Sequence, residues 1–251
     1  MSDSENIDPE DELLMHTYAT LPKNCKKYWN KRYNIFSKFD DGVFLTSELW
    51  YSVTPESTAK STARIVRKLL PDCENVLDVC CGGGGNTIQF ARYFKSVGGV
   101  DINANNIKCT KHNCGIYGVE DNTWFYQGDW NVMSQSTDWV PEFIPNEKFD
   151  FIFCSPPWGG PKYKTRGAFD LYAMQPLELR SLCSSMMKFT DNYGLFLPRY
   201  LDLDQIREVT EELYGPESKT RVVCLWQNGA PLGILAIFGP TFDVDIGAYR
   251  E

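Results

Sequence analysis

The sequence predicts an α/β fold, with a doubly wound, mostly parallel seven-stranded sheet behind a small helical N-terminal extension. Three observations predict this fold. From residue 75 onward, short apolar runs alternate with segments of helical periodicity, as in parallel strands joined by crossover helices. Glycine-rich or proline-rich turns follow several of these runs. The 251 residues, 43% of them apolar, are enough for one large core.

Composition and charge exclude several classes of protein. No apolar run approaches the roughly 20 residues that cross a bilayer, and acidic residues stand where a secretion signal would be basic and then apolar. We therefore expect a cytosolic or nuclear protein. A formal net charge of −8 argues against a protein that coats long nucleic acids. The two histidines, and nine cysteines with no Cys-x-x-Cys pair, predict no metal site and buried, unpaired thiols.

The N-terminal part is predicted to be helical. Residues 1–20 are expected to form a flexible acidic leader, and residues 21–70 the helical extension. Aromatic residues recur at helical spacing over 26–39, which predicts an amphipathic helix closed by the turn at 40–42. The same region carries six Lys or Arg residues and no acidic residue over 23–38. That run is either a solvated helical face or a phosphate-binding surface with stacking aromatics.

The last helix of the extension is expected to begin at Thr54 and Pro55. These two residues resemble an N-cap followed by proline in the first helical position. Ala59, Ala63 and Val66 mark one apolar face until proline at position 71 ends the helix.

Residues 71–251 are predicted to form the sheet domain. Strands are expected at 75–80, 97–101, 123–127, 149–154, 193–197, 221–226 and 233–238. Helices are expected at 86–94, 105–117, 177–189 and 202–213. The last two strands, joined by the loop 227–231, form an antiparallel pair, and 134–148 is expected to be a surface insertion. Ligands of such a sheet bind beyond the carboxyl ends of the strands.

A glycine-rich turn follows the first strand, because residues 82–85 are all glycine. A ligand can approach such a backbone closely. No Gly-Lys-Ser/Thr follows, so the turn is not a P-loop. Asp78 precedes the glycines, where a carboxylate would repel a pyrophosphate and attract a cationic amino group such as that of S-adenosylmethionine.

Acidic residues also follow the second and third strands. Asp101 is placed to grip the two hydroxyls of a ribose, with Ile102 beside a purine. Asp129 and Trp130 offer an acid and a ring to the adenine. Each acid alone has an equal alternative as a helix cap or loop residue. Acids at three successive strand ends favour nucleoside binding.

The fourth strand runs directly into Ser155, Pro156, Pro157 and Trp158. Two prolines make a stiff turn whose carbonyls can accept hydrogen bonds. An exocyclic amine can donate to the Pro156 carbonyl and the Ser155 hydroxyl while its base stacks on Trp158. Catalysis would then come mainly from orientation of the amine toward an activated methyl group. The alternative is a rigid proline turn beside a core tryptophan.

Together these motifs resemble the trimethylguanosine synthase family. The resemblance is carried by DVCCGGGGNT at 78–87, VDI at 100–102, SPPWGGP at 155–161 and FLPR at 196–199, and by the upstream stretch 27–56. It implies a Rossmann-like, S-adenosylmethionine-dependent methyltransferase fold. The implied reaction is two successive methyl transfers to the 2-amino group of the 7-methylguanosine cap of small nuclear and nucleolar RNAs.

The resemblance also implies roles for individual residues. Trp158 would stack on 7-methylguanine, whose delocalised positive charge suits an indole face. Catalytic contacts are implied for Ser155, Pro156 and Trp158, and substrate contacts for Trp158, Asn113 at the base edge, Lys27 and Arg199 on the cap phosphates, Ser52 and Tyr51. Cofactor contacts are implied for Thr54, Asp78, Cys80, Gly82, Asn86, Thr87, Asp101, Ile102, Asp129, Trp130 and Ser155.

Some alternatives stay open at the level of sequence. The same proline-aromatic turn would serve an exocyclic-amine methyltransferase acting on adenine or guanine within DNA or ribosomal RNA, and a catalytically silent cap-binding module is a further alternative. The resemblance implies a nuclear protein, in the nucleolus or Cajal bodies and also in the cytoplasm. Its expected partners are capped small RNA and proteins of RNA–protein particles, with no membrane and no metal.

Overall fold

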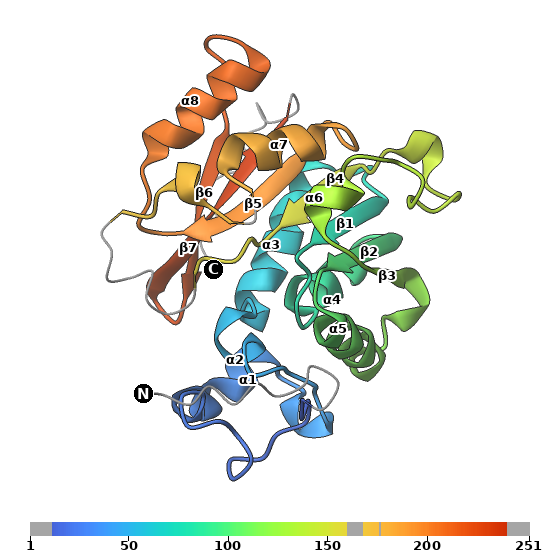
Figure 1. The fold of residues 1–251 in the computed structure, drawn as a ribbon, viewed down its shortest axis with the longest axis vertical. Coiled ribbons are helices and arrows are strands. Elements are labelled where there is room, and N and C mark those ends of the chain that lie inside the picture. Colours follow the sequence, from blue (N-terminus) through green and yellow to red (C-terminus); the bar gives the residue numbers. More distant parts are fainter. Residues whose placement is uncertain (1–11, 160–167, 176, 240–251) are drawn as a thin grey trace.

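The computed structural model describes residues 12–159, 168–175 and 177–239. Its centre is a seven-stranded sheet of order β3-β2-β1-β4-β5-β7-β6 (Figure 1). Neighbouring strands pair in parallel, except that β7 is antiparallel to both β5 and β6. The predicted α/β fold is therefore confirmed. The strands are β1 (Asn75–Val79), β2 (Ser96–Asp101), β3 (Thr123–Gln127), β4 (Phe151–Cys154), β5 (Tyr193–Pro198), β6 (Arg221–Gln227) and β7 (Ala230–Phe238).

Helices cover both faces of the sheet (Figure 1). Successive strand residues point to opposite faces, so Val76 packs in one buried cluster and Leu77 in the other. Burying each such side chain contributes about 1.5–3 kcal/mol. The first cluster includes residues of α3 (Glu56–Leu69), α4 (Gly85–Ala91) and α5 (Ala104–Tyr117), and the second those of α6 (Trp130–Met133), α7 (Leu179–Met187) and α8 (Leu203–Tyr214). None of the described helices is both long and apolar enough to cross a membrane.

The strand order reverses between β1 and β4. Val79, the last residue of β1, is paired with Val100 of β2 on one side and with Cys154 of β4 on the other. The segments after β1 and β4 therefore leave the same edge of the sheet side by side. A crevice at such a reversal is the usual ligand site of an open α/β sheet.

The extension is built from several short helices. The prediction of a single helix over 26–39 is therefore wrong. Phe36 interrupts the run, with φ −137° and ψ 118°. The Phe36 ring is 2% exposed and packs 6.0 Å from the Tyr117 ring, so tertiary packing overrides the local helical pattern. The pieces are η2 (Lys26–Lys31), α1 (Arg32–Ile35), η3 (Phe39–Asp41) and α2 (Leu49–Ser52). The predicted turn is present at Gly42, where φ is 95°.

Part of the expected leader packs against the extension. The Glu12 carboxylate accepts a hydrogen bond of 2.7 Å from the backbone N–H of Ser47. The carbonyl of Leu14 accepts one of 2.7 Å from the N–H of Leu45, and His16 is buried beside Trp50. The boundary predicted at residue 20 therefore lies inside packed structure, and of the expected leader residues 1–11 lie outside the described residues.

The segment 134–148 lies at the surface as predicted for most of its length, but three of its apolar residues pack against the core. The Trp139 ring stacks on Phe149 with centroids 6.2 Å apart, and its N–H donates to the carbonyl of Met133. Val140 and Ile144 are buried in the same cluster. The aromatic residues of this loop pack beside β3. The sequence did not predict this packing because the loop also contains many polar residues and prolines.

The predicted antiparallel pair is confirmed, with a tighter connection than expected. Asn228 and Gly229 alone link β6 to β7, with φ values of 50° and 75°. Two positive φ values are typical of the two-residue hairpin turn for which Asn-Gly is the preferred sequence.

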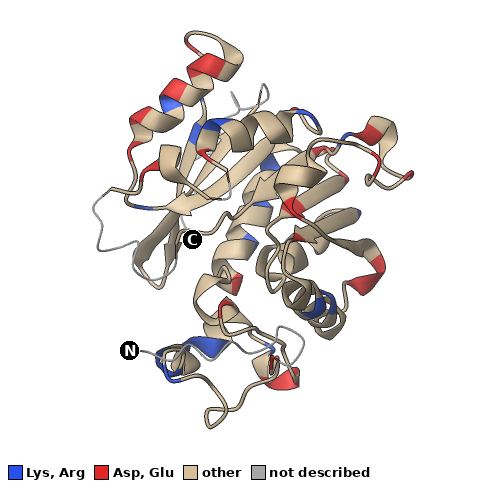
Figure 2. Ribbon diagram, in the orientation of Figure 1, with Lys and Arg blue, Asp and Glu red and all other residues tan. Residues whose placement is uncertain are grey.

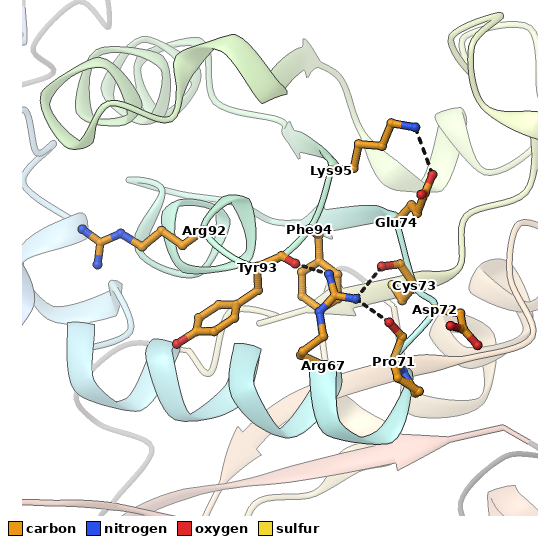
Figure 3. A pocket seen from close by; sticks show the side chains of 9 residues that line it. All are labelled: Arg67, Pro71, Asp72, Cys73, Glu74, Arg92, Tyr93, Phe94 and Lys95. Carbon is orange, nitrogen blue, oxygen red and sulfur yellow. Dashed lines mark hydrogen bonds and ion pairs between the residues drawn. The ribbon is translucent and has the colours of Figure 1, made fainter.

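A hollow of about 620 Å³ is lined by residues that include Cys73, Glu74 and Lys95 (Figure 3). Since these residues precede β1 and β2, the hollow lies at the opposite end of the sheet from the segments that follow β1 and β4. Its wall is held by Arg67, whose guanidinium donates to the carbonyls of Pro71, Cys73 and Tyr93. These bonds satisfy backbone carbonyls just beyond the C-terminal ends of α3 and α4. The arginine of this hollow is therefore occupied in holding the fold together.

Candidate active site

The glycine turn after β1 can be made only by residues without side chains at two positions. Gly84 has φ 85° and immediately precedes α4. A Cβ added at Gly85 would lie 2.9 Å from the carbonyl oxygen of Thr54, so the backbone of the extension lies directly against the turn. Cys80 and Gly82 also have positive φ, 63° and 57°. These positive φ values make a sharp turn at the end of β1.

Asp78 lies completely buried beneath this turn. One carboxylate oxygen accepts a hydrogen bond of 2.6 Å from the Thr87 hydroxyl, and the other has no partner among the described residues. Burial raises the pKa of Asp78 to about 7, and the Thr87 hydrogen bond opposes that rise. The amide oxygen of Asn86 is also buried and has no hydrogen-bond partner among the described residues. Unpartnered buried acceptors fit a ligand that brings hydrogen-bond donors and positive charge.

Asp101 connects the end of β2 to the glycine turn. Its carboxylate accepts from the backbone N–H groups of Gly82 and Asn103, both at 2.9 Å, and from the Asn106 amide at 3.1 Å. Burial raises the pKa of Asp101, and these hydrogen bonds oppose the rise. The carboxylate thus stands at the predicted strand end, where it also fixes the turn.

Glu48 adds negative charge to this edge and was missed in the sequence. Burial, followed by the charge of Asp101, raises the pKa of Glu48. Glu48 begins the turn of α2 in which the Ser52 hydroxyl donates to the Glu48 carbonyl at 3.0 Å. The sequence signal that could have identified Glu48 is its position one helical turn before Ser52, a residue already predicted to lie in the site. Acidic groups on both sides of the crevice favour a cationic ligand.

The third strand end contributes less than predicted. At the second strand end, by contrast, Ile102 is 66% exposed, so its side chain is available to a flat ring. The Asp129 carboxylate caps α6 by accepting from the N–H of Asn131 at 2.9 Å, which is the helix-cap alternative. The prediction that Trp130 faces an adenine is wrong. Trp130 is 4% exposed, and its N–H donates to the hydroxyl of Ser185 at 2.8 Å within the second core cluster.

The Ser155–Trp158 segment leaves β4 next to the glycine turn. Ser155 is half-buried, Pro156 is buried and Trp158 is half-buried. The indole N–H of Trp158 donates to the carbonyl of Phe196 in β5 at 3.2 Å, and the two rings lie 5.2 Å apart. The ring is therefore fixed in orientation without being enclosed in the core. The later part of the motif, from residue 160, lies outside the described residues.

The two basic residues predicted to hold the cap phosphates, Arg199 and Lys27, lie on different elements. Arg199 follows β5, and its guanidinium donates to the carbonyl of Pro231 at 2.8 Å. Lys27 is exposed, with its ammonium 5.0 Å over the Tyr28 ring. Tyr28 in turn lies 6.2 Å from the ring of Tyr51, so Lys27 lies close to α2.

Thr54 is a contact of the glycine turn and not the predicted helix N-cap. Its hydroxyl accepts a hydrogen bond of 3.0 Å from the Asn86 amide, and it makes no cap to α3. Pro55 occupies the residue before α3 instead. Thr54 thus holds the extension against the first turn of α4.

Asn113 does not lie at a base edge, so that prediction is wrong. The side chain is 0% exposed. Its amide oxygen accepts from the N–H of Phe44 at 2.8 Å, and its amide nitrogen donates to the carbonyls of Phe44 and Gly83, both at 2.9 Å. The role is to connect α5, the extension and the glycine turn, because all of its amide groups are used internally.

We expect Asn113→Ala to destabilise the protein by about 3 kcal/mol, because the change leaves three buried backbone groups without a partner. Thermal melting would show a fall of several degrees, and limited proteolysis should cut the extension near Phe44 more rapidly. Lys111→Ala, on the exposed side of the same helix, is the control and should melt like the unsubstituted protein. An unchanged melting temperature for Asn113→Ala would instead favour a ligand contact.

Asp78 should make stability depend on pH in the ligand-free protein. Its folded pKa of about 7 exceeds the ordinary value of 3.8, so the folded state binds more protons between these values. Stability is therefore present at low pH and is lost as pH rises toward about 7. We expect Asp78→Asn to melt higher than the unsubstituted protein at about pH 8 and to show a smaller difference at about pH 5. An equal difference at both pH values would contradict the shifted ionisation.

Solved structures share this fold at low sequence identity. The delta-N METTL16 MTase domain has a TM-score of 0.62 at 11% identity, over 85% of this chain and 95% of that one. The O-methyltransferase TomG from Streptomyces achromogenes has a TM-score of 0.52 at 12% identity, over 90% and 92%. Fold and site together define a Rossmann-like methyltransferase with S-adenosylmethionine as its cofactor. Residues 73–241 match the model of the RNA cap guanine-N2 methyltransferase family, and the chain belongs to that family.

Two similar proteins are both trimethylguanosine synthases. The chain is 40% identical to trimethylguanosine synthase of Saccharomyces cerevisiae over 224 residues, which cover 88% of this chain and 70% of the relative. It is 36% identical to trimethylguanosine synthase of Schizosaccharomyces pombe over 209 residues, which cover 82% and 84%. This protein is thus an S-adenosylmethionine-dependent cap methyltransferase, and the two alternatives left open by the sequence are not favoured.

Proposed function

We propose that this protein adds two methyl groups to the 2-amino group of 7-methylguanosine-capped small nuclear and nucleolar RNAs, giving the 2,2,7-trimethylguanosine cap. The observation that carries the proposal is the pairing of Val79 with Cys154. It makes the glycine turn and the Ser155–Trp158 segment leave adjacent strands at one edge of the sheet. A methyl donor held by the first and an amine held by the second would therefore meet there.

The cofactor supplies an activated methyl group when it is bound. In this proposal Asp101 holds the ribose hydroxyls, Ile102 packs on the adenine and Asp129 receives its amine. Asp78 favours the cationic end from beneath the turn, together with Thr87 and Asn86. Cys80, Gly82 and Thr54 line the turn. The unpartnered oxygens of Asp78 and Asn86 support this assignment.

Cap recognition is assigned to the other side of the crevice. Trp158 stacks on 7-methylguanine, with a cation–π contribution of about 0.5–2 kcal/mol. Lys27 and Arg199 hold the cap phosphates, the lysine as a point charge and the arginine as a fork. Tyr51 and Ser52 line the wall that α2 contributes.

Orientation of the amine is the main catalytic contribution in this proposal. The Ser155 hydroxyl and the Pro156 carbonyl accept the two amine hydrogens, so the nitrogen lone pair faces the methyl group. Holding reactants in this way can contribute about 7–11 kcal/mol. The neutral amine attacks first and loses its proton afterwards to water, so a strong base is not required. The histidines have other contacts, since His112 bonds to the carbonyl of Gly42 and His16 packs by Trp50.

The test is mass spectrometry of a 7-methylguanosine dinucleotide after incubation with the protein and S-adenosylmethionine. Two added methyl groups on the 2-amino nitrogen are expected, and the same dinucleotide without the 7-methyl group should stay unmodified. Equal modification of both would contradict cap recognition through the charged base. A nuclear location and contact with proteins of RNA–protein particles follow from the substrate, and tagged protein in cells would test the former.

A further inference from the structure

A basic surface lies on the extension, outside the residues assigned to the cap and the cofactor. It is formed by Lys23, Lys26, Lys31 and Arg32, and we call it the η2 surface. Six Lys or Arg residues and no acidic residue occupy 23–38, in a chain of net charge −8. Figure 2 shows the corresponding blue segments gathered over η2 and α1.

Aromatic contacts hold this surface in shape. The Trp29 ring stacks on Trp50 with centroids 5.8 Å apart, which anchors η2 to α2. The guanidinium of Arg32 lies 4.7 Å over the Trp29 ring, and the ammonium of Lys26 lies 5.0 Å over the Tyr18 ring. The positive groups are therefore displayed on a packed element rather than on a loose tail.

Within the described residues, no carboxylate lies within ion-pair distance of the charges of the η2 surface. Lys23 and Lys31 are exposed. The four ion pairs found in the described part of the chain all lie elsewhere, on Lys95, Arg180 and Arg207. A solvated helical face of an acidic protein would ordinarily mix both signs. Segregation of one sign marks a surface that attracts an anionic partner.

The η2 surface adjoins residues that the proposed function assigns to the cap. Lys27 belongs to the same short helix and lies over Tyr28, which packs near Tyr51 at the wall of the site. Lys23 and Lys31 lie four residues before and after Lys27 in the sequence, so phosphates that follow those held by Lys27 would pass near one of them. The adjacent aromatic residues are of the kind that stack on unpaired bases.

We propose that the η2 surface binds the phosphates of the RNA chain that follows the cap. The inference rests on the proposed function and names the part of the substrate beyond the cap. Lysine ammonium groups act as point charges, so this contact is independent of sequence and sensitive to salt. The surface raises affinity for long capped RNA without touching the reacting base.

The test compares Lys23→Ala/Lys31→Ala with Lys95→Ala/Lys219→Ala. The control pair removes the same charge from exposed residues at the other end of the sheet, before β2 and β6. Binding of a capped single-stranded RNA of about 20 nucleotides is measured by fluorescence anisotropy between about 0.05 M and 0.2 M salt. Methylation of the cap dinucleotide is measured in parallel.

Losing two contacts to a single strand should make the negative slope of log K against log salt less steep by about 1.4. If both proteins bind equally at about 1 M salt, the η2 variant binds the long RNA about 10-fold more weakly at 0.2 M and about 65-fold more weakly at 0.05 M. The control pair should match the unsubstituted protein, and all three should methylate the dinucleotide equally.

Several results would overturn the inference. These are an unchanged slope in the η2 variant, an equal loss in the control pair, or a long capped RNA that binds the unsubstituted protein no more tightly than the dinucleotide. Lys23→Gln/Lys31→Gln, which keeps the aliphatic stems, should reproduce the alanine result if charge is the cause. Failure of the proposed function would be seen separately, as absent methylation of the dinucleotide by the unsubstituted protein.

Discussion

Trp158→Ala is expected to lower kcat/KM for the capped dinucleotide by about 10³-fold, because both binding and orientation are lost. Loss of a cation–π contact of up to about 2 kcal/mol weakens base binding by up to about 30-fold. A base that shifts by about 1 Å can lose a further factor of about 10² in the chemical step. Steady-state kinetics with the dinucleotide and saturating S-adenosylmethionine would measure both effects.

The fold should survive this substitution. Trp158 is half-buried and its indole N–H donates to the carbonyl of Phe196, so we expect a fall of only a few degrees in melting temperature. Cofactor affinity, measured by calorimetry, should stay close to that of the unsubstituted protein. Trp158→Phe keeps a ring and should retain more activity than the alanine variant. An alanine variant that unfolds, or that stays fully active, would show that the ring is a core residue.

The order of strands and helices could be predicted because local pattern determined it. The strand at 123–127 was predicted at both ends, since its flanking turns are polar and its residues favour sheet. Predictions of individual elements were wrong where contacts between residues distant in the sequence determine the structure. Phe36 breaks the predicted helix because its ring is buried against Tyr117, which lies 81 residues further along the chain. The segment 134–148 reads as a polar loop, yet Trp139 packs in the core.

The same distinction applies to the residues of the candidate site. Residues that follow directly from a strand end, such as Asp101 and Ser155, could be placed because the carboxyl ends of parallel strands meet at one edge. Asn113 and Trp130 could not, because a sequence does not indicate which side of a helix faces inward when both sides carry mixed residues. Glu48 was missed because its proximity to Asp101 depends on how the extension docks.

Asp101→Ala is expected to weaken cofactor binding by about 10²-fold or more, because two charge-assisted hydrogen bonds to a ribose are worth about 1.5–3 kcal/mol each. The same carboxylate accepts from Gly82 and Asn103, so its loss also frees the glycine turn. Calorimetry with S-adenosylmethionine would measure the dissociation constant. At saturating cofactor the methyl-transfer rate should recover in part, since the amine is held by other residues.

A structural effect must be separated from the loss of a ligand contact. Asn103→Ala is the matched control, because Asn103 caps α5 by accepting from the N–H groups of Asn105 and Asn106. It should cost about 1 kcal/mol of stability while leaving the carboxylate at position 101 in place. Cofactor affinity should therefore fall steeply in the Asp101 variant and only slightly in the Asn103 variant. Equal losses in the two would assign the effect to the turn, and an unchanged dissociation constant for Asp101→Ala would remove the ribose contact from the site.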